Sequence, residues 1–341
     1  MKPIPREESS VKADRPLLLT QGDAAGIGPE VIAQAWARVP EPAAVVVGDP
    51  QVMRRALAQC RLQRPVQVLE TISEPRLPGA MAVWAPPGLP ATLLQGSQGL
   101  VRADCGLAAA RCIEAAVGAI QSGAARGLVT APVHKEALHA AGVPFPGHTE
   151  MLQHLAGVPA VRMMLVNDEL RVALVTVHVS LRKALDLIDG PTILETVRQV
   201  HAMLVGPLGI AAPRIAVAGL NPHAGEGGLF GDEEVTTIGP AVQQAQSEGL
   251  QVHGPYAPDT VFMRARRGEF DAVVAMTHDH GLIPIKYLGL DAGVNLTLGL
   301  PFVRTSPDHG TAFDRVGRGT ADPSSFLAAW QLGQRLTISA G

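Results

Sequence analysis

The chain has 341 residues, of which 47% are hydrophobic and 17% are charged. This length and composition predict a compact globular protein with two α/β domains or one large domain, and they exclude long disordered or fibrous segments. The net charge of −3 and the lack of a basic run interleaved with aromatic residues argue against a nucleic-acid partner.

The N-terminal segment 1–15 is polar and mixed in charge. It has neither the apolar stretch nor the cleavage pattern of a secretion signal, so we expect a cytoplasmic protein. No apolar run approaches the roughly 20 residues of a membrane-spanning helix, which predicts that the protein has no membrane partner. The three cysteines, Cys60, Cys105 and Cys112, form no CxxC pair and predict neither a disulfide framework nor a thiolate zinc site.

Short β-branched runs alternate along the chain with Ala-rich stretches of helical pattern. The alternation is typical of the α/β class, and we expect a two-domain α/β/α protein with mixed, largely parallel sheets. Polar, Gly-rich segments follow most of the strands, where open α/β sheets place their ligand sites. The predicted strands are residues 16–20, 44–47, 127–130, 161–166, 171–177, 215–220 and 271–276. The predicted helices are residues 106–121, 191–204, 233–248 and 323–336.

The segment GDAAGIGPE, residues 22–30, joins the first predicted strand to a helix. Its glycines permit a tight turn or a close approach of the backbone to a ligand. The order Gly22, Gly26, Gly28 does not match GxGxxG, and no GxxxxGK[ST] occurs, so the sequence supports neither a Rossmann phosphate loop nor a P-loop. Two interpretations stay open: a ligand-binding turn, and a simple tight turn with Pro29 entering a helix.

Side chains that suit a phosphate group lie in the FPGHTE segment and in the C-terminal third of the chain. Arginine offers a bidentate fork, lysine offers a point charge, and hydroxyl, amide and imidazole groups bind the remaining oxygens. Taken alone, each basic residue is more simply a solvated surface charge. The candidates are His148, Thr149, Lys286, Asn295 and Arg304.

Three histidines, His178, His223 and His278, each follow an apolar predicted strand. Imidazole is a common ligand of divalent ions, and three such ligands leave a coordination position open for a substrate oxygen. Any one of them, taken alone, is more simply a loop or core histidine bonded to backbone. Their equivalent positions at strand ends favour a metal site that folding assembles.

Two carboxylates accompany these histidines: Asp259 in the PDTVF segment and Asp279 beside His278. Either one can hold an imidazole in one tautomer or accept a proton. Both can equally be helix or turn caps, and Asp259 opens a plausible helix after Pro258, so both interpretations stay open.

Six segments, in this order, closely resemble the 4-hydroxythreonine-4-phosphate dehydrogenase family. They are GDAAGIGPE, TAPVHKEAL, GVPFPGHTEML, GLNPHAGEGGLFGDEE, HDHGLIPIK and GLPFVRTSPDHGTAFD. The resemblance extends from about residue 17 to the final predicted helix. More distantly, the first Gly-rich turn and the HGTAFD stretch resemble the isocitrate and isopropylmalate dehydrogenase fold, which is therefore the fold that we expect.

The resemblance implies an oxidoreductase of pyridoxine 5'-phosphate biosynthesis. Such an enzyme oxidises 4-phosphohydroxy-L-threonine with NAD or NADP to 2-amino-3-oxo-4-(phosphooxy)butanoate, which loses carbon dioxide to give 3-amino-2-oxopropyl phosphate. It also implies a divalent metal (zinc, magnesium or cobalt) at a site shared by the two subunits of a homodimer. We expect one domain in residues 1–141 and 317–341, a second with the metal ligands and dimer interface in residues 142–316, and the active site in the cleft between them.

The resemblance also implies roles for individual residues. His178, His223 and His278 match the metal ligands of the family, and the five phosphate candidates match its substrate positions. Lys286 and Asp259 are the expected catalytic residues. The HGTA turn resembles the loop that holds the adenosine of the dinucleotide. The implied cofactor site is therefore His309, Gly310, Thr311 and Ala312.

The chain departs from the usual pattern of the family at two positions. Ala24 stands where proline is usual, and His280 stands where HDQG has glutamine. Neither change removes an implied ligand, but changes near the metal can alter specificity. One alternative is therefore a paralogous dehydrogenase of a phosphorylated sugar acid such as 4-phosphothreonate or 4-phosphoerythronate. Another is a metal hydrolase or a noncatalytic metal-binding module, because three histidines with an open position also suit water activation.

Overall fold

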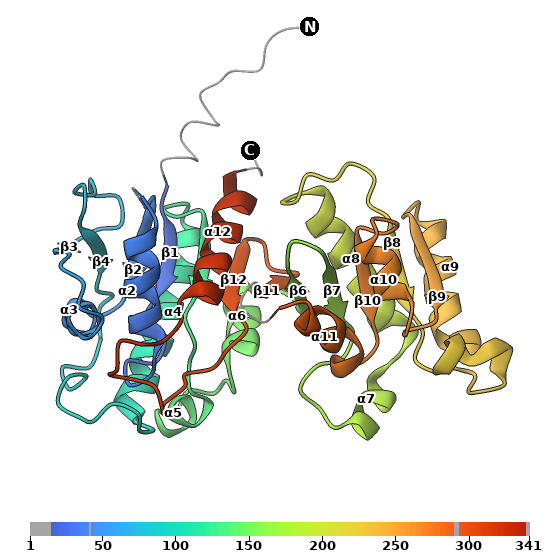
Figure 1. Cartoon of the computed structure of the whole chain (residues 1–341), viewed down its shortest axis with the longest axis horizontal. Coiled ribbons are helices and arrows are strands. Elements are labelled where there is room, and N and C mark those ends of the chain that lie inside the picture. Colours follow the sequence, from blue (N-terminus) through green and yellow to red (C-terminus); the bar gives the residue numbers. More distant parts are fainter. Residues whose placement is uncertain (1–14, 41, 290–292, 339–341) are drawn as a thin grey trace, which may run out of the picture. The chain divides into compact units, whose positions relative to one another are not determined.

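The computed structural model describes residues 15–40, 42–289 and 293–338, which fold into two α/β units (Figure 1). The first unit contains the chain up to residue 159 and the segment that begins at residue 300, and the second contains residues 160–299. The prediction of no secretion signal concerns the N-terminal segment 1–15, of which residues 1–14 lie outside the described residues. None of the helices in the described ranges has the length and apolarity to cross a bilayer.

The first unit is built on a parallel sheet with the strand order β3-β4-β2-β1-β5-β12. Its central strands are fully buried, as expected for a parallel sheet covered on both faces. Its elements are β1 (Leu17–Thr20), α2 (Gly28–Arg38), β2 (Ala44–Val47), α3 (Pro50–Gln59), β3 (Val66–Leu69), β4 (Met81–Trp84), α4 (Ala103–Gln121), β5 (Gly127–Thr130), α5 (Lys135–Ala140), α6 (His148–Ala156), β12 (Val303–Pro307) and α12 (Ser324–Ile338).

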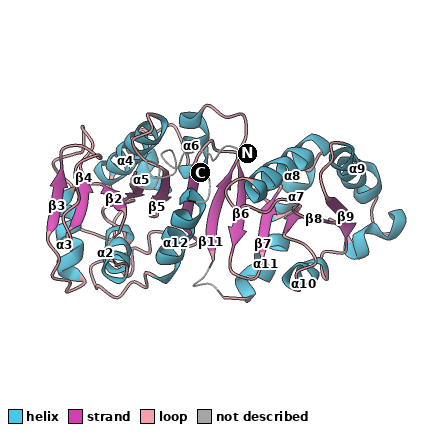
Figure 2. Cartoon of the chain, turned by 90° about the horizontal axis from the view of Figure 1, so that it is seen from above, coloured by secondary structure: helices cyan, strands magenta, loops and turns pink. Residues whose placement is uncertain are grey.

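Helices cover both faces of the first sheet. Helices α4 and α5 lie on one face, and α2, α3 and α12 lie on the other (Figure 2). Trp36 of α2 packs on Trp330 of α12 with ring centroids 5.4 Å apart, and both rings are buried. Burial of two indoles contributes a large apolar area, which holds the last helix of the unit, α12, against α2.

The second unit has the strand order β11-β6-β7-β10-β8-β9. Strand β6 is antiparallel to both of its neighbours, whereas β7, β10, β8 and β9 run parallel. Helices α8 and α9 cover one face, and α10 and α11 cover the other (Figure 2). Its elements are β6 (Arg162–Val166), β7 (Arg171–Leu174), α7 (Leu181–Leu187), α8 (Gly190–Val205), β8 (Ile215–Ala218), η1 (Pro222–Gly228), η2 (Glu234–Ile238), α9 (Gly239–Ser247), β9 (Val252–Tyr256), α10 (Val261–Arg266), β10 (Ala272–Ala275), α11 (His278–Tyr287) and β11 (Val294–Leu298).

The predicted α/β/α class with mixed, largely parallel sheets is confirmed. The predicted helix 233–248 is wrong in one respect, because it is divided into the π-helical turn η2 and the α-helix α9. The division falls at Gly239–Pro240. Proline has no backbone N–H to donate inside a helix, and it fits best in a first turn, so a new helix starts there.

The predicted domain boundaries were at residues 141/142 and 316/317. The two units of the structure instead divide at residues 159/160 and 299/300. Strand β12 pairs with β5, and α6 packs on α4, so both elements belong to the first unit. These pairings involve residues distant in sequence, which composition does not reveal. Several candidate site residues therefore lie in the first unit and not in the second: His148, Thr149, Arg304, His309, Gly310, Thr311 and Ala312.

Two glycines of helix α4 give a matched test of packing in the first unit. A Cβ at Gly106 lies 2.0 Å from the carbonyl oxygen of Ala137 in α5, whereas a Cβ at Gly118 meets nothing within 4 Å. Gly106→Ala is expected to lower the free energy of unfolding by about 1–3 kcal/mol, because α4 and α5 must separate. Gly118→Ala is expected to raise it by about 0.5–1 kcal/mol through helix propensity. Urea denaturation measures both, and equal stabilities of the two variants would contradict the packing.

Candidate active site

The side chains of His178 and His278 come together at the carboxyl ends of two neighbouring parallel strands. The backbone beyond β7 continues to pair with that beyond β10, since Val175 N donates to Ala275 O at 2.9 Å and Thr176 N donates to Met276 O at 3.2 Å. The two imidazole centroids are 5.7 Å apart. This separation brings two nitrogen donors into the same small volume, which suits a shared divalent ion.

The His278 ring is oriented by the next residue. Its Nδ1 lies 2.8 Å from Oδ1 of Asp279. His278 is the first residue of α11, and its side chain is 36% exposed, whereas that of Asp279 is 79% exposed. A carboxylate on Nδ1 favours the tautomer whose Nε2 is free to bind a metal. The pair thus has the arrangement in which an acidic residue supports a histidine ligand.

His223 lies on an unusual turn after β8. Six consecutive residues, 223–228, have positive φ, including His223 at 54°, Ala224 at 54° and Glu226 at 44°. Non-glycine residues seldom adopt this region, at a cost of about 1–2 kcal/mol each, and such strain clusters at functional sites. His223 itself is exposed. The His223 imidazole therefore stands on a strained backbone, and contacts with the neighbouring structure must hold that backbone in place.

Glu234 enforces this turn. Its carboxylate is buried and accepts hydrogen bonds from Leu220 N at 2.6 Å, Asn221 N at 2.7 Å and Asn221 Nδ2 at 2.9 Å. Burial raises the pKa of Glu234, but these hydrogen bonds from Asn221 and Leu220 outweigh it and leave the pKa below its ordinary value. The loop that carries His223 is thus held at its start by a buried, ionised carboxylate.

Glu234→Gln is expected to destabilise the protein by about 1–3 kcal/mol, because an amide replaces the charged acceptor and directs an N–H group at backbone donors. The same change is expected to weaken divalent-ion binding, because His223 loses its fixed position. Thermal unfolding with and without added Zn²⁺ measures both effects. Asp168→Asn, an exposed carboxylate in the turn between β6 and β7, is the control and is expected to change neither. A Glu234→Gln variant with native stability would refute this role.

The described residues of one chain hold no group of three His, Cys, Asp or Glu side chains that could bind a metal ion. The structure therefore brings His178 and His278 together but does not bring His223 to them within the chain. The donor set still fits a borderline divalent ion, since imidazoles with an acidic partner are its preferred ligands.

The first unit holds a buried cation, Arg304, whose side chain reaches the carboxyl end of β5. Arg304 on β12 is 4% exposed, and its Nε and Nη2 atoms donate to Oγ1 of Thr130 at 3.1 and 2.6 Å. Burial lowers the pKa of Arg304 to about 10, so the guanidinium stays charged at neutral pH. A buried guanidinium at this end of a parallel sheet suits an anionic ligand group.

His148 belongs to the same neighbourhood. Burial lowers the pKa of His148 well below its ordinary value, and the charge of Arg304 lowers it further. Its Nε2 atom is buried and has no hydrogen-bond partner in the described part of the chain. Buried polar atoms in native proteins nearly always have a partner, so this nitrogen indicates a place for a ligand oxygen. Thr149 follows it in the first turn of α6, where backbone N–H groups favour anions.

Lys286 and Asn295 lie in the second unit. Lys286 is half-buried in the last turn of α11, and Asn295 is half-buried on β11 opposite Leu165 of β6. The five phosphate candidates thus fall into two groups, with His148, Thr149 and Arg304 in the first unit. Within the first unit, the charge of Arg304 acts on His148, and Thr149 is the next residue in sequence, so these three residues lie in one neighbourhood.

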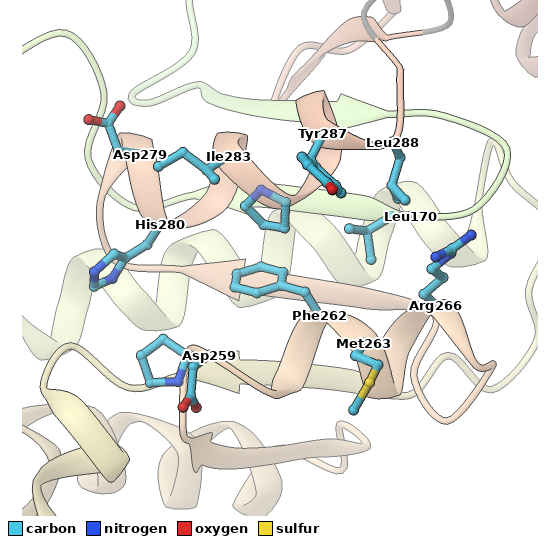
Figure 3. Close-up of a pocket in the computed structure, with 12 residues that line it drawn as sticks. Leu170, Asp259, Phe262, Met263, Arg266, Asp279, His280, Ile283, Tyr287 and Leu288 are labelled. Carbon is cyan, nitrogen blue, oxygen red and sulfur yellow. The ribbon is translucent and has the colours of Figure 1, made fainter.

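Asp259 is exposed at the start of α10. Helix α10 begins at Val261 with Thr260 at its N-cap, and the Thr260 side chain forms no capping hydrogen bond. Asp259 lines a groove of about 530 Å³ together with Asp279 and His280 (Figure 3). The structure therefore places the expected catalytic carboxylate beside the residues that follow His278.

The HGTA turn lies between β12 and α12. Thr311 is buried, and Ala312 has a positive φ of 40°, which is again rare for a residue with a side chain. His309 Nδ1 lies 3.0 Å from Gly310 O, and its Nε2 is a buried atom without a partner among the described residues. The turn has a defined shape and one unsatisfied nitrogen.

Glu234 and Asp23 are two of the buried carboxylates that the sequence did not indicate as site residues. Asp23 lies in the GDAAGIGPE segment, where its Oδ1 accepts from Ala25 N at 2.8 Å and its Oδ2 is buried without a partner in the described ranges. Burial raises the pKa of Asp23. The only sequence signal for either residue was an acidic side chain inside a Gly-rich motif, which predicts a turn as readily as a site.

Comparison with known proteins identifies the family. A family model described as pyridoxal phosphate biosynthetic protein PdxA matches residues 41–333. A 4-hydroxythreonine-4-phosphate dehydrogenase of Beijerinckia indica is 52% identical over 330 residues, which cover 96% of this chain and 97% of the relative. The chain belongs to the PdxA family. The resemblance drawn from the six motifs is thereby confirmed, as is the prediction of an oxidoreductase.

Two further members of the PdxA family are informative, one about the substrates in the family and the other about its fold. A D-threonate 4-phosphate dehydrogenase of Pectobacterium atrosepticum is 45% identical over 329 residues, covering 94% of this chain and 98% of the relative. The crystal structure of a 4-hydroxythreonine-4-phosphate dehydrogenase from Klebsiella pneumoniae has a TM-score of 0.89 at 42% identity, covering 95% of this chain and 98% of that one. The family thus includes dehydrogenases named for two different phosphorylated substrates.

Proposed function

We propose that the protein oxidises 4-phosphohydroxy-L-threonine with NAD or NADP, in a divalent-metal-dependent reaction. The product, 2-amino-3-oxo-4-(phosphooxy)butanoate, then decarboxylates to 3-amino-2-oxopropyl phosphate, a step toward pyridoxine 5'-phosphate. The observation that carries this proposal is the buried Arg304 beside the unpartnered Nε2 of His148, which together suit a phosphate group. A cytoplasmic location is part of the proposal.

The phosphate of the substrate is bound by Arg304, His148 and Thr149 in this proposal. The guanidinium supplies a charged fork, and the neutral imidazole and the threonine supply directed hydrogen bonds. We also propose Lys286 and Asn295 as substrate-binding residues. Binding energy from the phosphate orients the hydroxyl that is oxidised, which is how remote contacts contribute to rate.

We propose His178, His223 and His278 as ligands of one zinc, cobalt or magnesium ion. A divalent ion held there supplies a Lewis acid, which favours loss of the hydroxyl proton and stabilises negative charge during decarboxylation. Asp279 holds the His278 imidazole in the ligand tautomer. Because a single chain does not gather the three imidazoles, the site is completed by a second subunit in this proposal.

The second unit carries a surface suited to that subunit. The groove beside His280 is lined by apolar side chains, of which Met263, Ile283 and Tyr287 are 47%, 65% and 91% exposed (Figure 3). Exposed aromatic and aliphatic residues clustered around a hollow are typical of protein interfaces. The groove begins at Asp279, next to His278, so a homodimer formed there brings partner residues close to the proposed metal site.

Lys286 and Asp259 move protons in this proposal. Lys286 lies in the last turn of α11, and His278 is the first residue of the same helix. The helix therefore fixes the positions of Lys286 and His278 relative to each other. Asp259 is exposed in the single chain and is covered when the groove is occupied. The HGTA turn, His309 to Ala312, holds the adenosine of the dinucleotide.

A second candidate substrate is D-threonate 4-phosphate, or the related 4-phosphoerythronate. The D-threonate 4-phosphate dehydrogenases support it, since two of them are 45% and 46% identical to this chain. These substrates keep the phosphate but lack the amine. The discriminating contacts are therefore those at the amine, and His280 is a candidate because it follows Asp279 on the rim of the groove.

A competition assay tests the proposed substrate. The protein, with Zn²⁺ or Mg²⁺ and NAD, is given 4-phosphohydroxy-L-threonine and D-threonate 4-phosphate, separately and together, and kcat/KM is determined for each. The proposal predicts the higher kcat/KM for 4-phosphohydroxy-L-threonine. A higher value for the sugar acid transfers the assignment to the second candidate. NADH or NADPH formation from neither substrate with either dinucleotide would overturn both.

A further inference from the structure

The loop 309–319 has no strand or helix of its own, yet it is held at a defined position in the first unit. It joins β12 to α12 and appears as the red trace near the lower end of α2 (Figure 1). Its second half is fixed by Glu30, in the first turn of α2. Oε1 of Glu30 accepts from Gly317 N at 2.6 Å, and Oε2 accepts from Gly319 N at 2.9 Å. Glu30 is only 1% exposed.

The first half of the loop is fixed by the residues just before Glu30. Ile27 N donates to Thr311 O at 3.0 Å. A Cβ on Gly26 would lie 2.9 Å from the Cβ of Thr311, so only glycine permits this approach. The GDAAGIGPE segment thus contacts the loop directly at its HGTA end, which explains a motif that fits no phosphate-binding pattern.

A third contact holds the middle of the loop. The ring of Phe313 stacks on His134 with centroids 4.6 Å apart and an interplanar angle of 11°. Gly99 also approaches this point, since a Cβ there would lie 2.9 Å from Phe313 O. The loop therefore rests on several segments distant in sequence, and Glu30 contributes a carboxylate to these contacts.

The two hydrogen bonds of Glu30 are expected to hold loop 309–319 more strongly than the other contacts do. Hydrogen bonds from backbone N–H groups to a carboxylate are about twice as strong as hydrogen bonds between neutral groups. Because loop 309–319 lacks the hydrogen-bond ladder of a regular element, loss of two such bonds frees the loop before it unfolds the unit.

We propose that Glu30 is a positioning residue for dinucleotide binding: it holds loop 309–319 in the conformation that presents His309 to Ala312 to the cofactor. Glu30 does not touch the cofactor itself. The inference rests on the proposed assignment of the HGTA turn to the dinucleotide. It gives the GDAAGIGPE segment a role in cofactor affinity through the backbone of another loop.

Glu30→Gln tests the inference with calorimetry on the full-length protein. The variant keeps the side-chain shape but replaces one acceptor oxygen with an N–H donor facing a backbone N–H. The Kd for NAD, or for NADP if that is the dinucleotide bound by the native protein, is expected to rise about 10-fold. Binding of 4-phosphohydroxy-L-threonine in the absence of dinucleotide is expected to stay within about twofold of the native value. Glu70→Gln, an exposed carboxylate of the same unit, is expected to leave both unchanged.

Hydrogen exchange separates positioning from general destabilisation. In Glu30→Gln, peptides covering residues 309–319 are expected to exchange faster, while peptides of β1 and β5 keep their protection. If Glu30→Gln does not fold, Glu30→Asp, which keeps the charge on a shorter arm, is measured in the same two experiments. Equal weakening of dinucleotide and substrate, with faster exchange throughout the unit, would show a purely structural role and overturn the inference.

The proposed function can fail independently. If the native protein binds neither dinucleotide, the assignment of the HGTA turn is wrong. If the native protein binds one and Thr311→Ala weakens it, while Glu30→Gln or Glu30→Asp does not, only the role of Glu30 is refuted.

Discussion

Arg304→Met is expected to raise the KM for the phosphorylated substrate about 10²- to 10³-fold, because the proposed charge-assisted hydrogen bonds of the guanidinium to the phosphate are lost. Arg304 is 4% exposed, so water cannot replace the lost bonds cheaply. Methionine fills a similar volume without a charge, and removal of a buried cation need not destabilise the fold. Steady-state kinetics with NAD saturating measures the change.

Two further variants separate the loss of the phosphate contact from other effects of an arginine substitution. Arg54→Met changes an exposed arginine of the same unit and is expected to leave KM unchanged. Arg304→Lys keeps the charge but loses the fork, so its KM is expected to fall between those of the native protein and Arg304→Met. An Arg304→Met variant that is folded and has the native KM would remove the phosphate site from this part of the sheet.

His223→Ala is expected to lower kcat at least 10³-fold, because a catalytic ion with one ligand fewer is bound too weakly to act. The same variant is expected to lose binding of one Zn²⁺ per site in calorimetry. Its stability is expected to stay close to that of the native protein in the absence of metal, since the His223 ring is exposed and alanine keeps the Cβ that strains the left-handed backbone.

His139→Ala is the control for a histidine substitution. His139 is exposed on α5 and is not among the proposed ligands, and its loss is expected to change neither zinc binding nor kcat. Native turnover by His223→Ala at a Zn²⁺ concentration that saturates the native enzyme would exclude His223 as a ligand. A fall in kcat with undiminished zinc binding would instead assign it a role in substrate positioning.

The sequence predicted the class of fold because its signals are local. The strands at 44–47 and 127–130 are β-branched or apolar runs bounded by turn residues, and their bounds agree with β2 and β5. The domain boundaries were not predictable in this way. Whether β12 belongs to the first unit depends on its pairing with β5, about 175 residues earlier, and no local pattern reports such a pairing.

The candidate site was predictable in its residue types and less so in its arrangement. That His178 and His278 lie together follows from neighbouring parallel strands, which end at the same edge of a sheet. The support for His223 was not predictable, because it depends on Glu234 being buried against the backbone of residues 220 and 221. The same applies to Glu30, whose partners are glycine N–H groups near the other end of the chain.

Metal-dependent dinucleotide reduction is the most direct test of the account. The protein is freed of metal with a chelator, mixed with 4-phosphohydroxy-L-threonine and NAD or NADP, and followed by absorbance of the reduced dinucleotide before and after Zn²⁺, Co²⁺ or Mg²⁺ is added. The account predicts no reduction before the addition and steady reduction after it, with 3-amino-2-oxopropyl phosphate as the product. Reduction at the same rate with and without metal, or no reduction under any of these conditions, would contradict it.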